Sequence, residues 1–322
     1  MGFKLVQAIE SKQSRDNQII NYLDLVALAI AADVVPLTGE NRVLSFIGLQ
    51  IINSNPRPGI HSLLKKNIKK EYTISDLMYY VGPRINAAGR MKHASLALEL
   101  LTCNDINSVE KLALEIEDLN TSRRDIEKDI TSQAIEQVDN SSEKLNSIVV
   151  FDSDWNKGVI GIVASRLVDK YYKPSIVFCE SSKGVLTASA RSIKGLDLYS
   201  VLNQCKGFID QFGGHKYAAG LTIKKENLEG FKKHFENIVS QIIDKNIFEQ
   251  ELLIESKINL NEITPKFFRI LKQFEPFGPG NKSPLFLSEN LKTKGKAFEL
   301  GKEKEHIKLN LTQDNKTSYS SI

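Results

Sequence analysis

The chain has 322 residues, more than one typical domain holds, so two or three domains are expected. Hydrophobic residues make up 41% and charged residues 25% of the sequence, proportions that exclude wholesale disorder. The formal net charge of +4 permits a polyanionic partner, although a slightly basic protein without such a partner has the same composition.

Cysteine usage and hydropathy indicate a cytoplasmic protein. The three cysteines are far apart and form neither a CxxC pair nor a Cys/His cluster, which argues against a disulfide framework and a zinc site. The N-terminal MGFKLVQAIESK lacks the long apolar core of a secretory signal. The most apolar stretch, Leu23 to Leu37, contains two aspartates and is too short to cross a bilayer. We therefore expect a soluble chain without membrane contact.

The first hundred residues are predicted to be mostly helical. Apolar residues at helical spacing indicate one helix that begins near Leu23 and a second over 43–52, and Thr73 starts a further short helix. From 108 to 138 a narrow apolar stripe runs through charged sequence without Gly or Pro, which predicts a single helix about 45 Å long. We interpret this helix as an interdomain connector; a coiled-coil dimerisation helix fits less well because the stripe is imperfect.

An alternating α/β unit is predicted over 147–244. Short apolar runs at 147–151 and 175–179 indicate buried strands, separated by a helix from Val159 to Tyr171. Two more strands and a closing helix follow, at 184–191, 219–223 and 228–243. This order of elements favours a βαβ core with mixed additions.

Beyond residue 250 the pattern is that of a small β domain. The segment 251–260 is strand-like in composition, and alternation of apolar and polar residues over 306–312 predicts another strand. Between them we predict a short helix over 263–274, followed by a rigid turn in EPFGPGNKSP.

Two segments near the N-terminus carry candidate binding residues. Asp33 in AADVVPL stands at a helix-to-strand junction where a carboxylate can reach a hard metal ion, although a lone aspartate there is more often a helix-end residue. In GPRINAAGR, residues 82–90, small residues let the backbone approach a ligand, and the forks of Arg84 and Arg90 suit phosphate. We place phosphate binding ahead of a tight turn whose arginines pair with nearby acids.

Two later motifs predict further phosphate contacts. In ASARSIKG the alternation of a strand puts Ser189 and Arg191 on one face, where both can hold one phosphate; an exposed strand end without a ligand fits equally well. In FGGHKYAAG, Gly213 and Gly214 allow a nest of backbone N–H groups that binds anions. His215 beside them can donate to a phosphate or stack on a base, and the glycines favour that role over a structural one.

For two glycine-containing motifs we favour a structural role over ligand binding. The glycines of GVIGIVASRL, residues 158–167, lie at a predicted helix N-terminus where phosphate can bind, but no GxGxxG pattern or P-loop lysine accompanies them. We therefore favour close packing of that helix on the sheet. FGPGN, residues 277–281, is interpreted as a rigid turn first and as a nucleic-acid contact second.

Six of these motifs, in this order along residues 1 to about 310, resemble those of RecJ exonucleases in the DHH phosphoesterase superfamily: ADVVPL, GPRINAAGR, GVIGIVASRL, SARS, GGHKYAAG and FGPGN. The resemblance implies an α/β fold class with four parts. These are the C-terminal part of a DHH phosphoesterase domain at 1–106, a long connector helix at 107–145, an α/β DHH-associated, substrate-binding domain at 146–245, and a partial OB-type domain at 246–322.

The resemblance also implies an activity. RecJ enzymes degrade single-stranded DNA from the 5′ end in repair and recombination, and two Mn²⁺ or Mg²⁺ ions activate a water for the attack. By this likeness Asp33 would bind metal, and Arg84, Asn86 and Arg90 would line the phosphate path. The strand near its 5′ terminus would be held by the remaining candidates: Ser189, Arg191, Gly213, Gly214 and His215. A single-strand-binding protein and a helicase are candidate protein partners.

The sequence departs from the family pattern in two ways. It contains no Asp-His-His string, and Asn156 stands where the family pattern leads us to expect His in a Trp-His-x-Gly-Val run. With Asp33 as the one ligand left, we expect a fragment that begins within one domain and ends within another, with little or no nuclease activity by itself. Manganese-dependent release of nucleotides by this chain would contradict that expectation.

Two other functions fit part of the sequence. A DHH-family phosphodiesterase of oligonucleotides or cyclic dinucleotides would carry the glycine-glycine-histidine motif but would not continue into FGPGN and a β domain. A non-catalytic protein would bind single strands in a salt-sensitive manner without hydrolysis. Because a sheet without its first strands exposes open edges, we expect residues 1–100 to be poorly stable alone, and residues 147–244 to fold independently.

Overall fold

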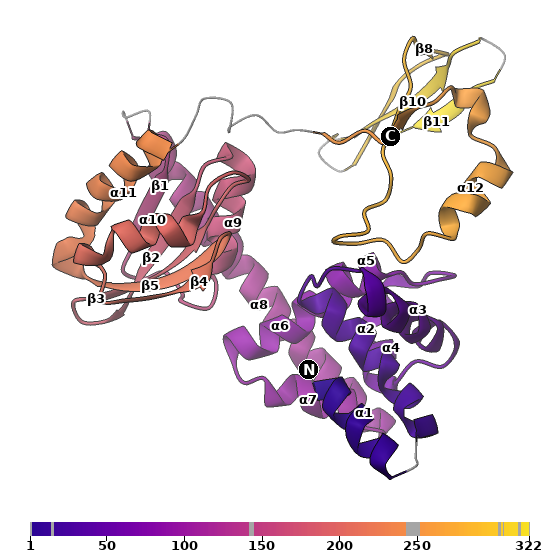
Figure 1. Ribbon diagram of the computed structural model, residues 1–322, viewed down its shortest axis with the longest axis horizontal. Coiled ribbons are helices and arrows are strands. Elements are labelled where there is room, and N and C mark those ends of the chain that lie inside the picture. The colour runs from indigo at the N-terminus through magenta and orange to yellow at the C-terminus, as the bar shows by residue number, and fades with distance from the viewer. Residues whose placement is uncertain are drawn as a thin grey trace. The chain divides into compact units, whose positions relative to one another are not determined.

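The computed structural model describes residues 2–13, 16–141, 145–242, 252–301, 304, 306–314 and 317–321 (Figure 1). Contacts divide the chain into two compact units. Unit 1 combines Met1–Gly82 with Glu251–Ile322, and unit 2 is Pro83–Gln250. In the described parts of the chain, no helix is both long and apolar enough to cross a membrane.

The N-terminal segment of unit 1 is helical, as predicted. Its elements are α1 (Gly2–Lys12), a 3₁₀ helix (Asp16–Tyr22), α2 (Leu23–Ala32), α3 (Gly39–Ser54), α4 (Pro58–Leu64), a 3₁₀ turn (Lys65–Asn67), α5 (Ile74–Asp76) and a π turn (Leu77–Val81). Helices α2 and α3 cross closely at Gly48. Glycine allows this approach, because a Cβ there would overlap the Leu23 carbonyl. Thr73 and Asp76 form a capping box at the start of α5, which explains why the sequence signal there was clear.

The expectation of exposed sheet edges in residues 1–100 is wrong, since the described residues of that range are helical or in turns and hold no strand. What they expose is apolar helix surface. Leu5 is 65% and Phe46 48% exposed, and both lie on helices of unit 1. Such surface rather than open strand edges is what burdens this segment in isolation.

The C-terminal segment of unit 1 is irregular with short strands. It contains β6 (Ser256–Lys257), a 3₁₀ turn (Leu260–Glu262), α12 (Pro265–Lys272), β7 (Phe286–Leu287), β8 (Lys292–Thr293), β9 (Phe298–Leu300), β10 (His306–Thr312) and β11 (Tyr319–Ser321). Antiparallel strands run in the order β11-β10-β8, with β9 also paired to β10, while β6 and β7 are parallel. The predicted helix over 263–274 and strand over 306–312 are confirmed.

The strand predicted over 251–260 is wrong over most of its length. Glu251 lies outside the described residues, and only Ser256 and Lys257 are strand. Leu252 and Leu253 are more than 70% exposed, so these apolar side chains pack into no core. A capping box between Asn259 and Glu262 then starts a 3₁₀ turn, which prevents the strand from continuing.

The FGPGN turn fastens the two segments of unit 1 together. The Leu37 N–H donates to the Pro279 carbonyl at 2.6 Å. Arg42 Nη2 donates to the carbonyls of Gln273 and Glu275 at 3.2 and 3.1 Å. A Cβ at Gly278 would lie 2.5 Å from Leu37 Cδ1, so glycine is needed for this close approach. The structural interpretation of FGPGN is confirmed.

Unit 2 is an α/β unit that begins with helices. Its elements are α6 (Gly82–Met91), α7 (Ser95–Thr102), α8 (Ile106–Asp139), β1 (Ile148–Asp152), α9 (Ile160–Tyr171), β2 (Ser175–Ser182), β3 (Val185–Arg191), α10 (Leu198–Gln204), a 3₁₀ turn (Lys206–Phe208), β4 (Gln211–His215), β5 (Ala218–Lys224), a 3₁₀ turn (Lys225–Asn227) and α11 (Leu228–Ile242). The uninterrupted helix predicted over 108–138 is confirmed as the 34-residue α8.

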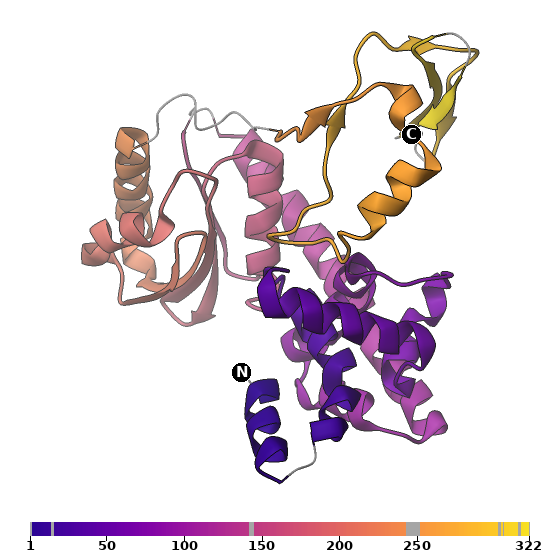
Figure 2. The ribbon, with the colours of Figure 1, turned by 45° about the vertical axis from the view of Figure 1, so that its right-hand side comes forward.

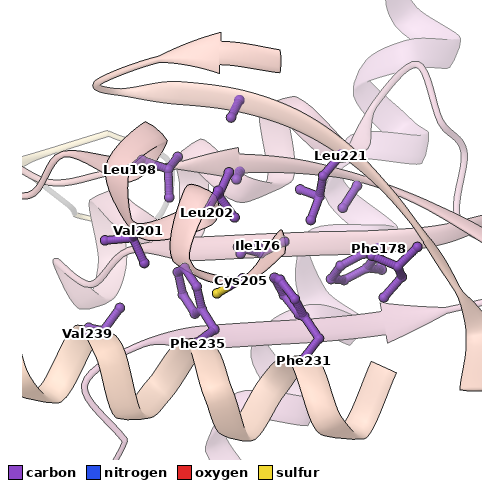
Figure 3. Close-up of a cluster of buried hydrophobic side chains, with 14 of the residues drawn as sticks. Ile176, Phe178, Leu198, Val201, Leu202, Cys205, Leu221, Phe231, Phe235 and Val239 are labelled. Atoms are coloured by element: carbon purple, nitrogen blue, oxygen red, sulfur yellow. The ribbon is translucent and has the colours of Figure 1, made fainter. Parts of the chain in front are cut away.

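The five-stranded sheet of unit 2 runs in the order β1-β2-β3-β5-β4 and lies between α11 and α9 (Figure 2). Strands β1 and β2 are parallel, as a βαβ unit requires, and the other pairs are antiparallel. Phe178 of β2 points to one face and packs edge-on against Phe231 of α11 at 5.6 Å between ring centres (Figure 3). Cys179, the next residue, joins the cluster of α8 and α9 on the other face. Both faces are therefore covered, which explains the continuous apolar run of β2.

Candidate functional site

The GPRINAAGR motif forms helix α6 and not the glycine-rich bend expected from its composition. Its small residues serve packing, because Ala87 and Ala88 are fully buried. Asn86 and Arg90 are four residues apart, so they share one face of the helix, and both are exposed. Arg84 is only 9% exposed and lies on a different side.

Arg84 is engaged by an acid of its own unit. Its Nε lies 2.5 Å from Glu117 Oε2 and its Nη2 3.2 Å from Glu117 Oε1, a forked ion pair between α6 and α8. This is the pairing weighed as the alternative for these arginines, and it describes Arg84 but not Arg90. Buried paired charges of this kind position helices, and freeing Arg84 for a ligand would leave Glu117 without that fork.

Arg90 anchors the loop that precedes α9. Its Nη1 donates to the Gly158 carbonyl at 2.9 Å, and a Cβ at Gly158 would lie 2.8 Å from the Arg90 carbonyl oxygen. The Gly158 N–H in turn donates to Asn156 Oδ1 at 2.8 Å. Asn156, the residue that departs from the family pattern, thus closes a turn of the kind that Asn side chains favour. The end of α6 and the start of α9 are held together by these contacts.

Ser189 and Arg191 lie on one face of β3, as the alternation predicted. Arg191 Nη1 donates to Ser189 Oγ at 3.0 Å and to the Ala190 carbonyl at 2.9 Å. Burial lowers the pKa of Arg191, and the charge of Arg90 lowers it further. Arg90 holds the Gly158 carbonyl and Arg191 lies against Gly161, so both guanidinium groups lie beside the start of α9, where an anion would be stabilised.

Gly161 explains how α9 fits over this pair. A Cβ at Gly161 would lie 3.0 Å from Ser189 Oγ and 3.2 Å from Arg191 Nη2. The close packing of helix on sheet that was favoured for GVIGIVASRL is confirmed at this residue. Its consequence is that Ser189 and Arg191 lie against the first turn of α9, whose N-terminal end favours anions.

The FGGH segment is strand β4 and not an anion-binding nest. Across the antiparallel pairs, Gly213 lies opposite Gly220, which lies opposite Ser189. Residues directly opposite one another share a face, so the glycine row continues the face of Ser189 without side chains. In the next row His215 lies opposite Ala218, which lies opposite Arg191. The sheet therefore offers a flat, exposed strip that ends in a histidine.

Gly214 and His215 differ in where they point. Gly214 faces the other side of the strand with φ +153°, and a Cβ there would overlap the Ala218 carbonyl. His215 is exposed, and its Nδ1 accepts the Tyr217 N–H at 3.3 Å. Gly220 is the residue of this strip that the sequence reasoning passed over. It belongs to the quoted AAG, so the strand alternation of 218–224 could have placed it.

Asp33 lies in unit 1, whereas the arginine–serine face lies in unit 2. It caps the C-terminus of α2, is exposed, and precedes Val34, whose φ of +54° is rare for a β-branched residue. Throughout the described ranges of the chain, no group of three or more His, Cys, Asp and Glu side chains is placed to hold a metal ion. No such group includes Asp33 within these ranges, and its role as a ligand stays a prediction.

Comparisons with known families match this arrangement. The model of the DHHA1 domain matches residues 144–241, and that of the RecJ OB domain matches residues 254–322. The chain is 36% identical over 299 residues to the single-stranded-DNA-specific exonuclease RecJ of Haemophilus influenzae, covering 89% of this chain and 52% of that protein. The chain belongs to the RecJ family.

Other RecJ proteins also match this chain over most of its length. RecJ of Bacillus subtilis is 34% identical, with 98% of this chain and 40% of the relative covered. The crystal structure of RecJ from Thermus thermophilus in complex with Mn²⁺ matches with a TM-score of 0.80 and 28% identity, over 94% of this chain and 44% of that one. This RecJ-family chain thus spans about half the length of the curated relatives it matches.

Proposed function

We propose that this chain is the strand- and phosphate-binding half of a RecJ-type exonuclease that degrades single-stranded DNA from the 5′ end. The observation that carries the proposal is the convergence of Arg90 and Arg191 with Ser189 at one end of the glycine strip. A terminal phosphate would accept hydrogen bonds from the guanidinium groups and the hydroxyl. The first nucleotide would then lie on the row of Gly213 and Gly220, which has no side chains, and His215 would stack on it or donate to it.

The relatives support this proposal, since the curated proteins matched over most of the chain are named single-stranded-DNA-specific exonucleases. The match of 254–322 to the RecJ OB domain favours it over a compact phosphodiesterase of short oligonucleotides. We propose the same division as before: 1–106 and 246–322 flank the connector at 107–145 and the binding domain at 146–245. Asn86 on the exposed face of α6 would line the path, and Gly214 would keep β4 in register.

The metal chemistry belongs to the proposed whole enzyme. Solved RecJ structures are described as complexes with Mn²⁺ or Mg²⁺, and such ions would activate the water in a two-metal reaction. Asp33 would contribute one carboxylate to that site, and this chain by itself is expected to release no nucleotides. Cooperation with a single-strand-binding protein or a helicase stays a prediction.

The test is whether the chain senses a 5′ phosphate. Fluorescence anisotropy in EDTA would compare twelve-residue oligothymidines labelled at the 3′ end, with a 5′ phosphate or a 5′ hydroxyl. We expect the phosphorylated strand to bind roughly 10-fold more tightly, because charge-assisted hydrogen bonds to one phosphate contribute about 1.5–3 kcal/mol. Arg191→Gln should remove most of this preference while leaving residual binding.

The matched control is Lys232→Gln. Lys232 lies on α11, on the other face of the sheet, and pairs with Glu229. The Lys232→Gln substitution removes one positive charge from the same unit and leaves the site unchanged. Both strands should therefore bind to this variant as they do to the unaltered chain. Equal affinity of the unaltered chain for both strands would contradict the proposal, and so would a loss of preference in Lys232→Gln.

A further inference from the structure

Four arginines meet in unit 2 where α6, α8, α9 and β3 come together, and we call them the arginine cluster: Arg90, Arg123, Arg166 and Arg191. Two of them belong to the site described above. The other two, Arg123 on α8 and Arg166 on α9, are joined by Glu127 of α8. Glu127 Oε1 lies 3.1 Å from Arg166 Nε, and Glu127 Oε2 lies 3.4 Å from Arg123 Nη1.

The four side chains are gathered around α9. Arg90 Nη1 donates to the Gly158 carbonyl just before the helix, and a Cβ at Gly161 would lie 3.2 Å from Arg191 Nη2. Arg166 on the same helix is joined through Glu127 to Arg123. In agreement with this placement, burial lowers the pKa of both Arg123 and Arg191 and the charge of Arg90 lowers each pKa further, while Glu127 opposes the shift of Arg123.

The cluster carries more positive charge than its surroundings neutralise. Nearby lysines such as Lys92 and Lys170 have a carboxylate each, Glu115 and Asp139. Among the described residues, Glu127 is the carboxylate that ion-pairs with the cluster; it contacts Arg123 and Arg166, whereas Arg90 and Arg191 have no ion pair. The positive charge that Glu127 leaves over would be stabilised by a bound anion.

Within the cluster Arg123 is fixed and Arg166 is available. The Arg123 side chain is 12% exposed, donates from Nη2 to Asn120 Oδ1 at 3.0 Å, and keeps a buried Nε without a hydrogen-bond partner among the described residues. The Arg166 side chain is 59% exposed. Glu127 contacts Arg166 at Nε, and no hydrogen bond within the described residues involves the terminal nitrogens of Arg166, which can donate to phosphate.

The spacing along α9 separates Arg166 from the terminal site. Gly161 touches Ser189 and Arg191, and Arg166 follows five residues later, a rise of about 7.5 Å along the helix. We propose that Arg166, positioned by Glu127 and Arg123, binds an internal phosphate of the DNA strand whose 5′ end lies at Arg191. This proposal rests on the proposed function and adds a second phosphate subsite to it.

The test compares strand lengths. Binding of thymidine 5′-monophosphate, which has no internal phosphate, and of 5′-phosphorylated dT12 to the full chain would be measured in EDTA over a series of salt concentrations, dT12 by anisotropy and the mononucleotide by competition. Arg166→Gln should weaken dT12 roughly 5- to 10-fold and reduce the salt slope by about 0.7, the value for one phosphate contact on a single strand. Binding of the mononucleotide should not change, because it offers Arg166 no internal phosphate. Arg166→Lys should keep the salt slope and lose part of the affinity, since it retains charge without the fork.

The outcomes separate this inference from the proposed function. Lys232→Gln is again the control, and equal thermal unfolding of all variants would show that each is folded. If Arg166→Gln binds dT12 as Lys232→Gln does, while the 5′-phosphate preference persists, the subsite is wrong and the proposed function stands. If Arg166→Gln weakens thymidine 5′-monophosphate and dT12 equally, Arg166 acts at the terminal phosphate and the second subsite is again wrong. If the unaltered chain binds neither of them, both proposals fail.

Discussion

At the scale of single residues, the two adjacent glycines of β4 have opposite requirements. A Cβ at Gly213 would enter open space above the exposed strip. A Cβ at Gly214 would overlap the Ala218 carbonyl and lie 2.7 Å from Ala219 Cβ, with a φ of +153° that side chains rarely adopt. The fold requires glycine at position 214, whereas at position 213 it would accept a side chain.

Alanine substitutions should separate these two requirements. We expect Gly214→Ala to lower the free energy of unfolding by about 1–3 kcal/mol, because backbone strain and an overlap with β5 add together. Gly213→Ala should change it by less than about 0.5 kcal/mol. Urea unfolding followed by circular dichroism measures both. Equal losses in the two variants would show that the register of β4 against β5 is misassigned.

At the scale of elements, α10 and α11 seal one face of the sheet around a buried thiol. Cys205 directly follows α10 and is fully buried beside Phe231 and Phe235 of α11 (Figure 3). Burial raises the pKa of the Cys205 thiol to about 12. This thiol therefore behaves as a small apolar group in the core and stays protonated where an exposed cysteine would ionise.

Because of the buried thiol, the free energy of unfolding should decrease as the pH becomes alkaline. Because the folded pKa is raised, the stabilisation is complete below the unfolded pKa of about 8.5 and is lost as pH rises from there toward the folded value. Cys205→Ala should unfold more easily than the unaltered chain at pH 7.5. That difference should shrink by about 1–2 kcal/mol by pH 10, because only the unaltered unfolded chain gains a thiolate there. Denaturant unfolding at both pH values measures it, and a constant difference would count against a buried thiol.

The elements that the sequence predicts well are those whose signal is local. Uninterrupted charge and apolar periodicity specify α8, and a capping box marks the start of α5. Strand β4 could not be predicted, because its two glycines lack strand propensity and it is held by pairing with β5. Helix α10 has only seven residues, too few for a periodic pattern.

The candidate site was predictable in its residue types and not in its partners. Alternation placed Ser189 and Arg191 on one face, and the glycine-rich motifs around them pointed to Arg90 and His215. The pairing of Arg84 with Glu117, 33 residues away, depends on how α6 packs on α8, which no local pattern reveals. Arg166 was hidden for the same reason, since its significance comes from Glu127 on another helix.

At the scale of the whole molecule, the chain leaves unit 1 at Gly82 and returns to it at Glu251. Unit 2 between these points is continuous in sequence and has clusters of buried residues on both faces of its sheet. It satisfies the requirements of a domain that folds by itself. Unit 1, in contrast, needs two distant segments to complete its contacts.

Excised pieces should show which part of the molecule binds DNA. We expect residues 83–242 to unfold cooperatively and to prefer a 5′-phosphorylated strand, because they include both Arg90 and Arg191. Residues 145–242 should fold with a lower melting temperature, because α9 loses its contacts with Ile130 and Ala134 of α8, and should bind more weakly. Residues 1–100 alone should be the most rapidly proteolysed. Equal binding by residues 83–242 and residues 145–242 would show that Arg90 is not part of the site.

The contacts at the FGPGN turn delay the completion of unit 1 until late in synthesis. Arg42 meets the carbonyl of Gln273 across 231 residues of sequence, all of which must leave the ribosome before that contact can form. At typical rates of translation this wait lasts roughly 10–50 s. During it unit 2 has emerged and can fold, while Leu37 and its surroundings are still uncovered. Chaperones that shield nascent chains should therefore engage the first segment for longer than the sheet that follows it.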